Sequence, residues 1–476
     1  MPVNNKKNLQ KNEKKSDNLK GKEEPPSQEI ISKPEDLLKF LKHGYKKTTD
    51  LKIGLESEKS GIHTDTLEPV KYSGAKGYNK ILEKLHDELG WEVTQNERKN
   101  IFELKRGDSR ITLEADGRIE LSSRPRESLH DLARDFRIHQ NELVEVSKLF
   151  NIAWLGIGMQ PFHGQAKIEY APKPRYQSFL SYFKNKKGGE TILKKINGIN
   201  TNYDYTSEED AVRKFQIGSK IAPIVNAMFA CSPFMNNGVG KYMSHRLWYF
   251  GTFDIRRFQL PKLIYEKNFN FEKWLNFILE INMFYIERDN EIIKLPKIKF
   301  KKFLKEGYKN YRCEFNDFYL HMKAVWTETR IKAHGYTEWR PFDSLPPDLT
   351  MSTTAVTKGI FYSKKNILDA VEDLVKKWDY SLIMKLRKLA YTKALSGTFN
   401  KNEKILDYAK KLLEIATEGL KNQAVFNEEK QDESVYLEPI KEYVMVKGMS
   451  PAEYAVKEWN NGWKKNPQKL IEWCSF

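Results

Sequence analysis

The sequence predicts an α+β fold, in which an antiparallel sheet packs against helices on one side. Segments in the first third of the chain alternate apolar and polar residues with the period of a strand, and two of them flank a tight Asp-Gly turn. Long segments from about residue 126 onward carry apolar residues at helical spacing. Residues 35–476 contain no repeat and no low-complexity linker, so they are expected to share one architecture.

Order is expected to begin near residue 34. Residues 1–33 are rich in Lys, Asn, Glu, Ser and Pro and nearly lack large apolar residues, which predicts a disordered basic and polar tail. Ser32-Lys-Pro-Glu35 is a capping-box pattern that opens a helix over 36–43. Residues 34–476 are predicted to form a single domain whose part from about residue 365 is helical.

The first predicted strand carries two acids on one face. It lies in Leu51-Lys-Ile-Gly-Leu-Glu-Ser-Glu58. Alternate residues of a strand share a face, so its apolar residues point one way and Glu56 and Glu58 point the other.

A hairpin in 111–121 carries two more acids, and its turn decides where they point. A two-residue Asp-Gly turn would mix apolar and acidic side chains on each face. A three-residue loop over 115–117, with Gly117 left-handed, pairs Thr112 with Glu120 and gathers the apolar residues on the opposite face. Because register follows the hydrophobic face, we predict the three-residue loop, with Glu114 and Glu120 on one side.

Further elements follow from periodicity and caps. Apolar spacing predicts a helix over 126–150, and the capping box Thr206-Ser-Glu-Glu209 opens another that runs toward Phe229. Between them we expect a short buried strand at 153–159 and a strand at 199–205 with Asn200, Asn202 and Asp204 on its polar face. Helices are also expected at 271–284, at 403–420 and from Ser450-Pro-Ala-Glu453.

Four acids on neighbouring strands indicate a site for a divalent metal and ATP. Acids on one face are also the ordinary state of a half-exposed sheet, and for a single strand that is the better interpretation. Here two neighbouring strands carry only acids and hydroxyls on that face, with little lysine to balance them. Adjacent glutamates repel one another unless a cation lies between them. A third acidic segment, Glu338-Trp-Arg-Pro-Phe-Asp343, would put Glu338 and Arg340 on one face of a strand, with the arginine suited to bracing phosphate.

Charge and cysteine usage restrict partners and compartment. The formal net charge of +17 is densest in 294–309, with seven lysines and one glutamate, where alternation in 297–301 predicts an amphipathic strand with a solvated lysine face. No nucleic-acid motif accompanies it, so no nucleic-acid partner is expected. Three widely spaced cysteines, no secretory signal and no apolar stretch long enough to span a bilayer predict a cytoplasmic protein without a membrane partner. A monomer and a homodimer both remain open.

The ordered series of motifs resembles the plant and proteobacterial type of glutamate–cysteine ligase. The similarity extends from about residue 50 to 350. It is carried by 53–58, Glu120-Leu-Ser, Trp154-Leu-Gly-Ile-Gly-Met-Gln-Pro161, Arg175-Tyr176, Asn202-Tyr-Asp204, Arg213-Lys-Phe215, Ala227-Met-Phe-Ala-Cys-Ser-Pro233 and the Glu338–Asp343 segment.

The resemblance implies a glutamine synthetase-like fold, in which a curved antiparallel sheet forms a funnel lined by metal-binding carboxylates. ATP would phosphorylate the γ-carboxylate of glutamate, and the cysteine amine would displace phosphate to give γ-glutamylcysteine. Two or three Mg²⁺ ions, or Mn²⁺, are implied, because phosphoryl transfer between anions requires cations. The implied metal ligands are Glu56, Glu58, Glu114, Glu120 and Glu338; the implied ATP and catalytic residues are Glu58, Glu338 and Arg340; the implied substrate-binding residues are Arg175, Asn202 and Arg213.

One segment departs from the family pattern. In this region the family carries an arginine-rich segment followed by a run of aspartates. The corresponding residues here are 244–257, which keep only Asp254 of the aspartates and carry their arginines at shifted positions. Two alternatives therefore stand beside glutamate–cysteine ligation: a ligase of the same fold with another acid or amine, and a catalytically silent binding protein. Regulatory cysteine pairs of plant members have no counterpart, so no disulfide switch is expected.

Overall fold

A computed structural model describes residues 29–42, 44–97, 100–258, 261–289, 291–332, 334–363 and 365–476. Within these residues the chain forms an α+β fold around one nine-stranded sheet, and every strand pair in it is antiparallel. The strand order is β12 (Thr329–Lys332), β13 (Tyr336–Asp343), β7 (Gly198–Asp204), β1 (Ile53–His63), β5 (Ile119–Ser122), β4 (Ser109–Leu113), β3 (Asn100–Arg106) and β2 (Glu92–Glu97), with β6 (Ile152–Leu155) also pairing with β1.

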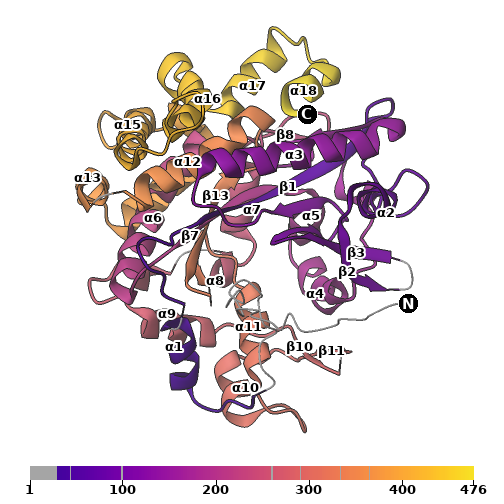
Figure 1. Ribbon diagram of the computed structural model, residues 1–476, viewed down its shortest axis with the longest axis vertical. Helices are drawn as coiled ribbons and strands as arrows, with labels where there is room; N and C mark the ends of the chain where they lie inside the picture. Colours follow the sequence, from indigo (N-terminus) through magenta and orange to yellow (C-terminus); the bar gives the residue numbers. More distant parts are fainter. Residues whose placement is uncertain are drawn as a thin grey trace, which may run out of the picture.

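Helices cover the apolar face of this sheet (Figure 1). The inner layer consists of α2 (Tyr78–Leu89), α3 (Leu129–Ser147), α6 (Glu208–Met228) and α12 (Pro347–Phe361), which contact the strands directly. Strand residues such as Ile53, Leu113 and Trp339 are fully buried against them in one large core. The predicted layering, with helices on the apolar side of an antiparallel sheet, is confirmed.

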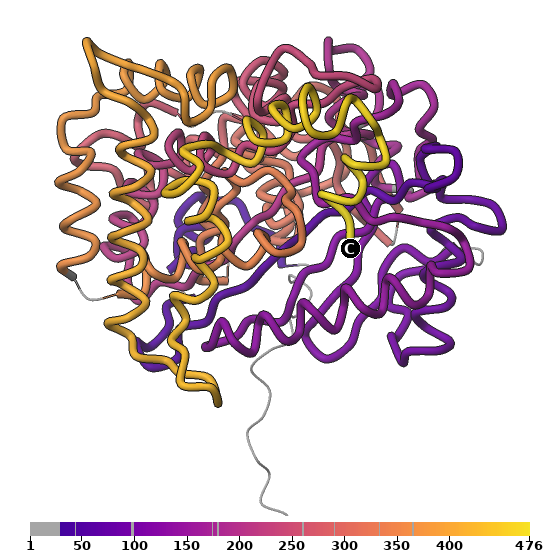
Figure 2. The backbone as a smooth tube through the Cα atoms, turned by 90° about the horizontal axis from the view of Figure 1, so that it is seen from above, coloured from indigo at the N-terminus to yellow at the C-terminus, as the bar shows by residue number. Residues whose placement is uncertain are grey.

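The part beyond residue 365 is mainly helical, as predicted. It contains α13 (Lys365–Val375), α14 (Tyr380–Lys393), α15 (Ile405–Gln423), α16 (Glu438–Lys441), a π-helical turn (Glu442–Lys447), α17 (Pro451–Asn460) and α18 (Pro467–Cys474), with one small hairpin, β14 (Thr398–Phe399) and β15 (Glu403–Lys404). Ser450 caps α17 through the predicted capping box. In Figure 2 the yellow carboxyl-terminal segment ends beside purple segments of the chain. There Ser475 forms an isolated antiparallel β-bridge with Leu155 of β6.

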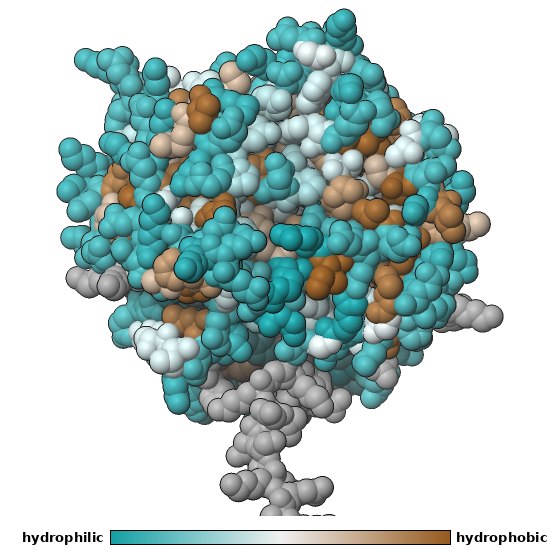
Figure 3. Space-filling view, turned by 45° about the horizontal axis from the view of Figure 1, so that its top comes forward, coloured by the Kyte–Doolittle hydropathy of each residue, from teal (hydrophilic) through white to brown (hydrophobic). Residues whose placement is uncertain are grey.

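A second, smaller hydrophobic core lies at the bottom of the view in Figure 1, at the end of the molecule opposite the carboxyl-terminal helices. It packs α1 (Pro34–Lys42), α9 (Phe271–Leu279), α10 (Phe300–Glu306) and α11 (Phe315–Lys323) beside the hairpin β10 (Tyr285–Arg288) and β11 (Glu291–Lys294). The remaining elements are α4 (Pro174–Lys184), α5 (Gly189–Lys195), α7 (His245–Thr252), α8 (Ile255–Phe258) and the short hairpin β8 (Phe234–Met235) and β9 (Gly238–Val239). On the face in Figure 3, hydrophilic side chains predominate and hydrophobic ones are scattered among them.

Several predicted boundaries need correction. Of the predicted tail, residues 1–28 lie outside the described residues, while Ile31 is buried and its N–H bonds the Cys313 carbonyl, so packing begins before residue 34. The cap of α6 is Ser207, one residue later than predicted, because its hydroxyl accepts the Asp210 N–H. The strand predicted at 297–301 is wrong: β11 ends at Lys294, just before Pro296, and α10 begins at Phe300.

The predicted hairpin register is confirmed. Thr112 pairs with Glu120, the Glu114 N–H bonds the Arg118 carbonyl, and Gly117 has a left-handed φ of 92°. A Cβ on Gly117 would lie 3.0 Å from Cδ2 of Tyr78, so this turn requires glycine for both its backbone and its space.

We therefore expect Gly117→Ala to destabilise the fold by about 1–2 kcal/mol from backbone strain, and further through the tyrosine contact. Gly90→Ala is the matched control, because Gly90 also has a positive φ, of 71°, but open space around its Cβ position. Thermal melting measures both variants. If Gly117→Ala melts at or above the temperature of Gly90→Ala, the close packing of this turn does not limit stability.

Candidate active site

Three of the predicted acids meet at the centre of the sheet. Glu58 on β1 lies opposite Glu120 on β5, and Glu114 follows β4 at the start of the three-residue loop. One carboxylate oxygen from each lies within 4.8 Å of the other two. We call Glu58, Glu114 and Glu120 the acid cluster.

Burial and mutual repulsion disfavour the charged forms of Glu58 and Glu120. Burial, together with the charge of Glu114, raises the pKa of Glu58 to about 7, against the opposing pull of Arg118 and other arginines. Burial, then Glu114 and the other acids, also raise the pKa of Glu120 well above its ordinary value, although Thr112 donates a hydrogen bond of 2.8 Å to it.

These residues fit a divalent metal ion. Three hard oxygen ligands lie close together, and a bound cation would offset the repulsion between them, which adds to burial in raising the pKa values of Glu58 and Glu120. Arg118 stands beside the acid cluster, with its Nε 3.7 Å from Glu58 and its Nη2 3.8 Å from Glu114, but its short ion pair of 2.6 Å goes to Asp116. It offsets part of the negative charge and leaves the three carboxylate oxygens facing one another.

Glu56 lies in the next row of the same face and is held by amides. The side-chain nitrogens of Asn200 and Asn202, both on β7, donate to its two oxygens at 2.8 and 2.9 Å. Its charge contributes to the raised pKa of Glu120, so it lies near the acid cluster without belonging to it. The predicted polar face of β7 thus serves to orient Glu56, and one of the two amides is that of the predicted substrate-binding residue Asn202.

Glu338 lies further along the face, on β13, and is surrounded by cations. Its side chain is 0% exposed and accepts hydrogen bonds from Arg330 at 2.9 Å, from Lys332 at 2.9 Å and from Arg340 at 2.5 Å. Burial opposes its charge, but these three cations hold its pKa well below the ordinary value. The carboxylate is therefore fully paired within the protein.

Arg340 is bonded to Glu338 and lies within the electrostatic field of Glu58, a member of the acid cluster. Burial opposes the charge of Arg340, but Glu338, and then Glu56 and Glu58, raise its pKa. The guanidinium therefore interacts electrostatically with the acids of β1 as well as with Glu338. Its Nε is buried and has no hydrogen-bond partner within the described part of the chain.

Sequence reasoning missed a second arginine at this place. Arg246, on α7, is buried, and its Nη2 donates to the Arg340 carbonyl at 3.0 Å. Burial lowers its pKa to about 10, while Asp343 and Glu58 oppose that shift. A Cβ on Gly198 would lie 2.7 Å from its Nη2, so Gly198 on β7 makes room for the guanidinium.

The two other predicted arginines lie in different environments. Arg175, near the start of α4, donates to the Tyr176 hydroxyl at 3.0 Å and feels the charge of Glu114, so it borders the acid cluster. Arg213, on α6, instead bonds Glu372 and Asp369 of α13. The structure thus places Arg213 in a helix–helix ion pair and does not bring it to the acids.

The segment that departs from the family pattern forms α7 and α8. Asp254, its retained aspartate, accepts from Tyr182 and pairs with Lys186 at 3.5 Å and Arg257 at 3.6 Å. Arg257 in turn is buried and donates to the carbonyls of Ala324 and Asn282. Asp254 is thus tied into a structural network, and Arg246 is the residue of this segment that reaches the acids.

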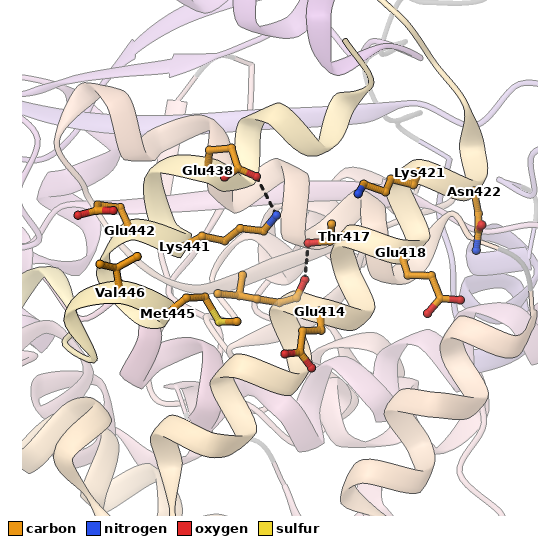
Figure 4. A pocket seen from close by; sticks show the side chains of 11 residues that line it. Glu414, Thr417, Glu418, Lys421, Asn422, Glu438, Lys441, Glu442, Met445 and Val446 are labelled. Carbon is orange, nitrogen blue, oxygen red and sulfur yellow. Dashed lines mark hydrogen bonds and ion pairs between the residues drawn. The ribbon is translucent and has the colours of Figure 1, made fainter.

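An open groove of about 690 Å³ lies elsewhere, between α15 and the segment from α16 through the π-helical turn (Figure 4). Its lining includes Glu414, Glu418 and Val446, and Glu438 pairs with Lys441, one turn further along α16, at 2.8 Å. None of the predicted site residues lines it. Separately, no described helix is long and apolar enough to cross a lipid bilayer.

The fold and the site together define the class. A broad antiparallel sheet that presents clustered carboxylates beside buried arginines is the apparatus of an ATP-dependent carboxylate–amine ligase. The chain belongs to glutamate-cysteine ligase family 2, whose model matches residues 52–466.

Known relatives agree with this assignment. The chain is 28% identical to the chloroplastic glutamate–cysteine ligase B of Oryza sativa subsp. japonica, over 94% of this chain and 89% of that protein. It is also 28% identical to the chloroplastic glutamate–cysteine ligase of Arabidopsis thaliana, over 94% and 85%. A crystal structure of glutamate–cysteine ligase from Francisella tularensis in complex with AMP has the same fold, with a TM-score of 0.54 at 14% identity over 90% of this chain and 88% of that one.

Proposed function

We propose that this protein joins the γ-carboxylate of L-glutamate to the amine of L-cysteine in an ATP-dependent reaction that gives γ-glutamylcysteine, ADP and phosphate. The observation that carries the proposal is the acid cluster beside Arg340 and Arg246. Membership of the family and the names of the relatives support these substrates. The AMP complex of the Francisella tularensis protein supports a nucleotide site.

Glu58, Glu114 and Glu120 would hold Mg²⁺, or Mn²⁺, with Glu56 as a further ligand oriented by its two asparagines. Bound there, two or three such ions supply the positive charge that phosphoryl transfer between anions needs. Arg340 and Arg246 lie beside the same acids and would stabilise negative charge on the transferred phosphoryl group.

The reaction has two steps. An oxygen of the glutamate γ-carboxylate attacks the γ-phosphorus of ATP, and ADP leaves. The cysteine nitrogen, as the free amine, then attacks the acyl carbon, phosphate leaves with the bonding electrons, and the nitrogen gives up one proton to the departing phosphate or to solvent. Arg175, bordering the acid cluster, and Asn202, beside Glu56, are our candidates for contacts with the substrates.

Two predicted roles change. We assign Glu338 to positioning, because a carboxylate that already pairs with Arg330, Lys332 and Arg340 has little capacity left for a metal ion. Its role is to orient Arg340 toward the phosphoryl group. Arg213 is not assigned to substrate, because its guanidinium is taken up by two carboxylates of α13.

One assay tests the proposal. Purified protein is incubated with Mg²⁺, ATP, glutamate and cysteine, and both phosphate release and product mass are followed. We expect phosphate release that needs both amino acids and a product with the mass of γ-glutamylcysteine. Release only with another amine or acid would replace these substrates while keeping the ligase chemistry. No turnover with any acid–amine pair, and no binding of Mg²⁺-ATP, would leave a binding protein.

A further inference from the structure

A buried lysine, Lys173, lies beside the acid cluster. Lys173 is the N-terminal cap residue of α4 and is 1% exposed. Its ammonium makes no hydrogen bond and no ion pair with any described residue, although its backbone carbonyl accepts the Tyr176 N–H. A buried amine without a partner carries a desolvation cost that proteins normally avoid, so its presence needs an explanation.

The backbone places Lys173 next to the acid-bearing hairpin. The Ala171 N–H bonds the carbonyl of Ala115, in the loop between Glu114 and Glu120, at 2.9 Å. The Tyr176 hydroxyl donates to the carbonyl of Leu113, the residue before Glu114, at 3.0 Å. Lys173 is therefore held over the edge of the acid cluster by bonds on both sides of it.

The electrostatic environment of Lys173 favours an anion from outside the protein. Burial and the charge of Arg175 lower the pKa of Lys173 to about 7, and the acids Glu103, Glu114 and Glu120 act in the opposite direction without contacting it. Arg175 is the second cation at this end of α4, and the first turn of the helix adds its positive dipole end. Together, two cations and a helix amino terminus form a site that favours the binding of negatively charged oxygens.

We propose that Lys173 is a substrate-contacting residue whose ammonium binds an anionic oxygen of a substrate, at a site formed by the amino-terminal end of α4 and Arg175. The proposal rests on the ligase function above, in which every substrate carries such oxygens. The phosphate chain of the nucleotide and a carboxylate of an amino acid are the two sources, and they share this chemistry.

Lys173→Met tests this site, with Lys173→Arg as the conservative variant. We expect Lys173→Met to lower kcat/KM about tenfold or more, because a charge-assisted hydrogen bond to the substrate is lost, and Lys173→Arg to recover part of it. A rise in KM for ATP assigns the phosphate chain, and a rise in KM for glutamate or cysteine assigns a carboxylate. Kinetics within twofold of wild type for all three substrates would overturn the proposal.

Thermal melting without ligand separates this role from a structural one. A purely structural counter-ion of the acid cluster would lower the melting temperature when removed. Our proposal expects Lys173→Met to melt at or above the wild-type temperature, because an uncompensated buried amine is replaced by an apolar side chain of similar length. A lowered melting temperature with kcat and all KM values changed only through loss of folded protein would overturn it.

Lys194→Met is the matched control. Lys194, on α5, is also buried, but its ammonium donates to the Gln165 carbonyl at 3.1 Å and lies 4.2 Å from the centre of the Tyr170 ring. We expect it to melt at a lower temperature and to keep wild-type kinetics. Isothermal titration with Mg²⁺-ATP and with L-glutamate gives a readout that does not depend on turnover. Suppose that the wild type shows no ligation but binds Mg²⁺-ATP or L-glutamate more tightly than Lys173→Met does. This result would support the anion site at Lys173 and contradict the proposed reaction.

Discussion

Glu120→Gln is expected to lower Mg²⁺-dependent turnover by about 10³-fold or more while raising the melting temperature of the metal-free protein. Glutamine keeps the shape of the side chain and the acceptor for the Thr112 hydroxyl. It removes one of three carboxylate oxygens that lie within 4.8 Å of one another, so the metal is bound less well. It also removes a carboxylate whose pKa is raised by burial and by the charges of Glu114 and the other acids, so the folded state gains stability at neutral pH.

Glu103→Gln is the control for this experiment. Glu103, on β3, lies in the same row of the sheet, opposite Thr112, but pairs with Arg110 at 3.0 Å and stands outside the acid cluster. The turnover of Glu103→Gln should stay within about threefold of wild type, because a partly exposed ion pair contributes little and Glu103 is not one of the clustered carboxylates. Steady-state rates and melting curves at several Mg²⁺ concentrations measure both variants. Near-normal turnover in Glu120→Gln would show that the acid cluster does not hold the catalytic metal.

Local rules were sufficient to predict which acids share the polar face of each strand or hairpin, whereas the β1–β5 pairing that brings Glu58 to Glu120 joins distant segments. The hairpin register follows from the demand that the apolar residues of 111–121 share a face, and the structure has that register, with Glu114 and Glu120 brought to Glu58. Alternation in β13 likewise places Glu338 and Arg340 on one face with Trp339 on the other. These are statements about neighbours in one strand or one hairpin, which sequence periodicity reports directly.

Three cations at this site, Arg330, Lys332 and Arg246, were missed from the sequence for two different reasons. Arg330 and Lys332 flank a single apolar residue, Ile331, in a four-residue strand, which is too short a pattern to identify the strand from sequence. The pairing of Arg330 with Glu338 depends in addition on the turn that follows this strand. Arg246 carries no such signal, because it reaches the sheet from α7, and the position of a helix over a sheet is set by tertiary packing. The same limit explains Arg213, whose carboxylate partners lie more than 150 residues away in sequence.

Glu338→Ala is expected to destabilise the protein by about 3–5 kcal/mol, the opposite sign from Glu120→Gln. Glu338 is fully buried and is the common partner of Arg330, Lys332 and Arg340. Removing it leaves three cations close together without their anion, and that cost exceeds the loss of the individual hydrogen bonds. Chemical denaturation, with the midpoint and slope followed together, measures the change. Activity should also be lost, because Arg340 no longer has a fixed orientation.

Dependence on pH distinguishes positioning from metal binding at Glu338. Its cations hold its folded-state pKa well below the ordinary value of a glutamate, so its stabilising contribution is complete above about pH 5 and is lost as pH falls through the folded-state pKa. The stability gap between wild type and Glu338→Gln, measured without metal, should therefore be constant at neutral pH and narrow in acid. A carboxylate that serves as a metal ligand would not stabilise the metal-free protein, so its replacement by glutamine would leave the melting temperature unchanged or raise it, as expected for Glu120→Gln. If Glu338→Gln melts with the wild type under those conditions but needs more Mg²⁺ for turnover, Glu338 is a metal ligand and the positioning role is wrong.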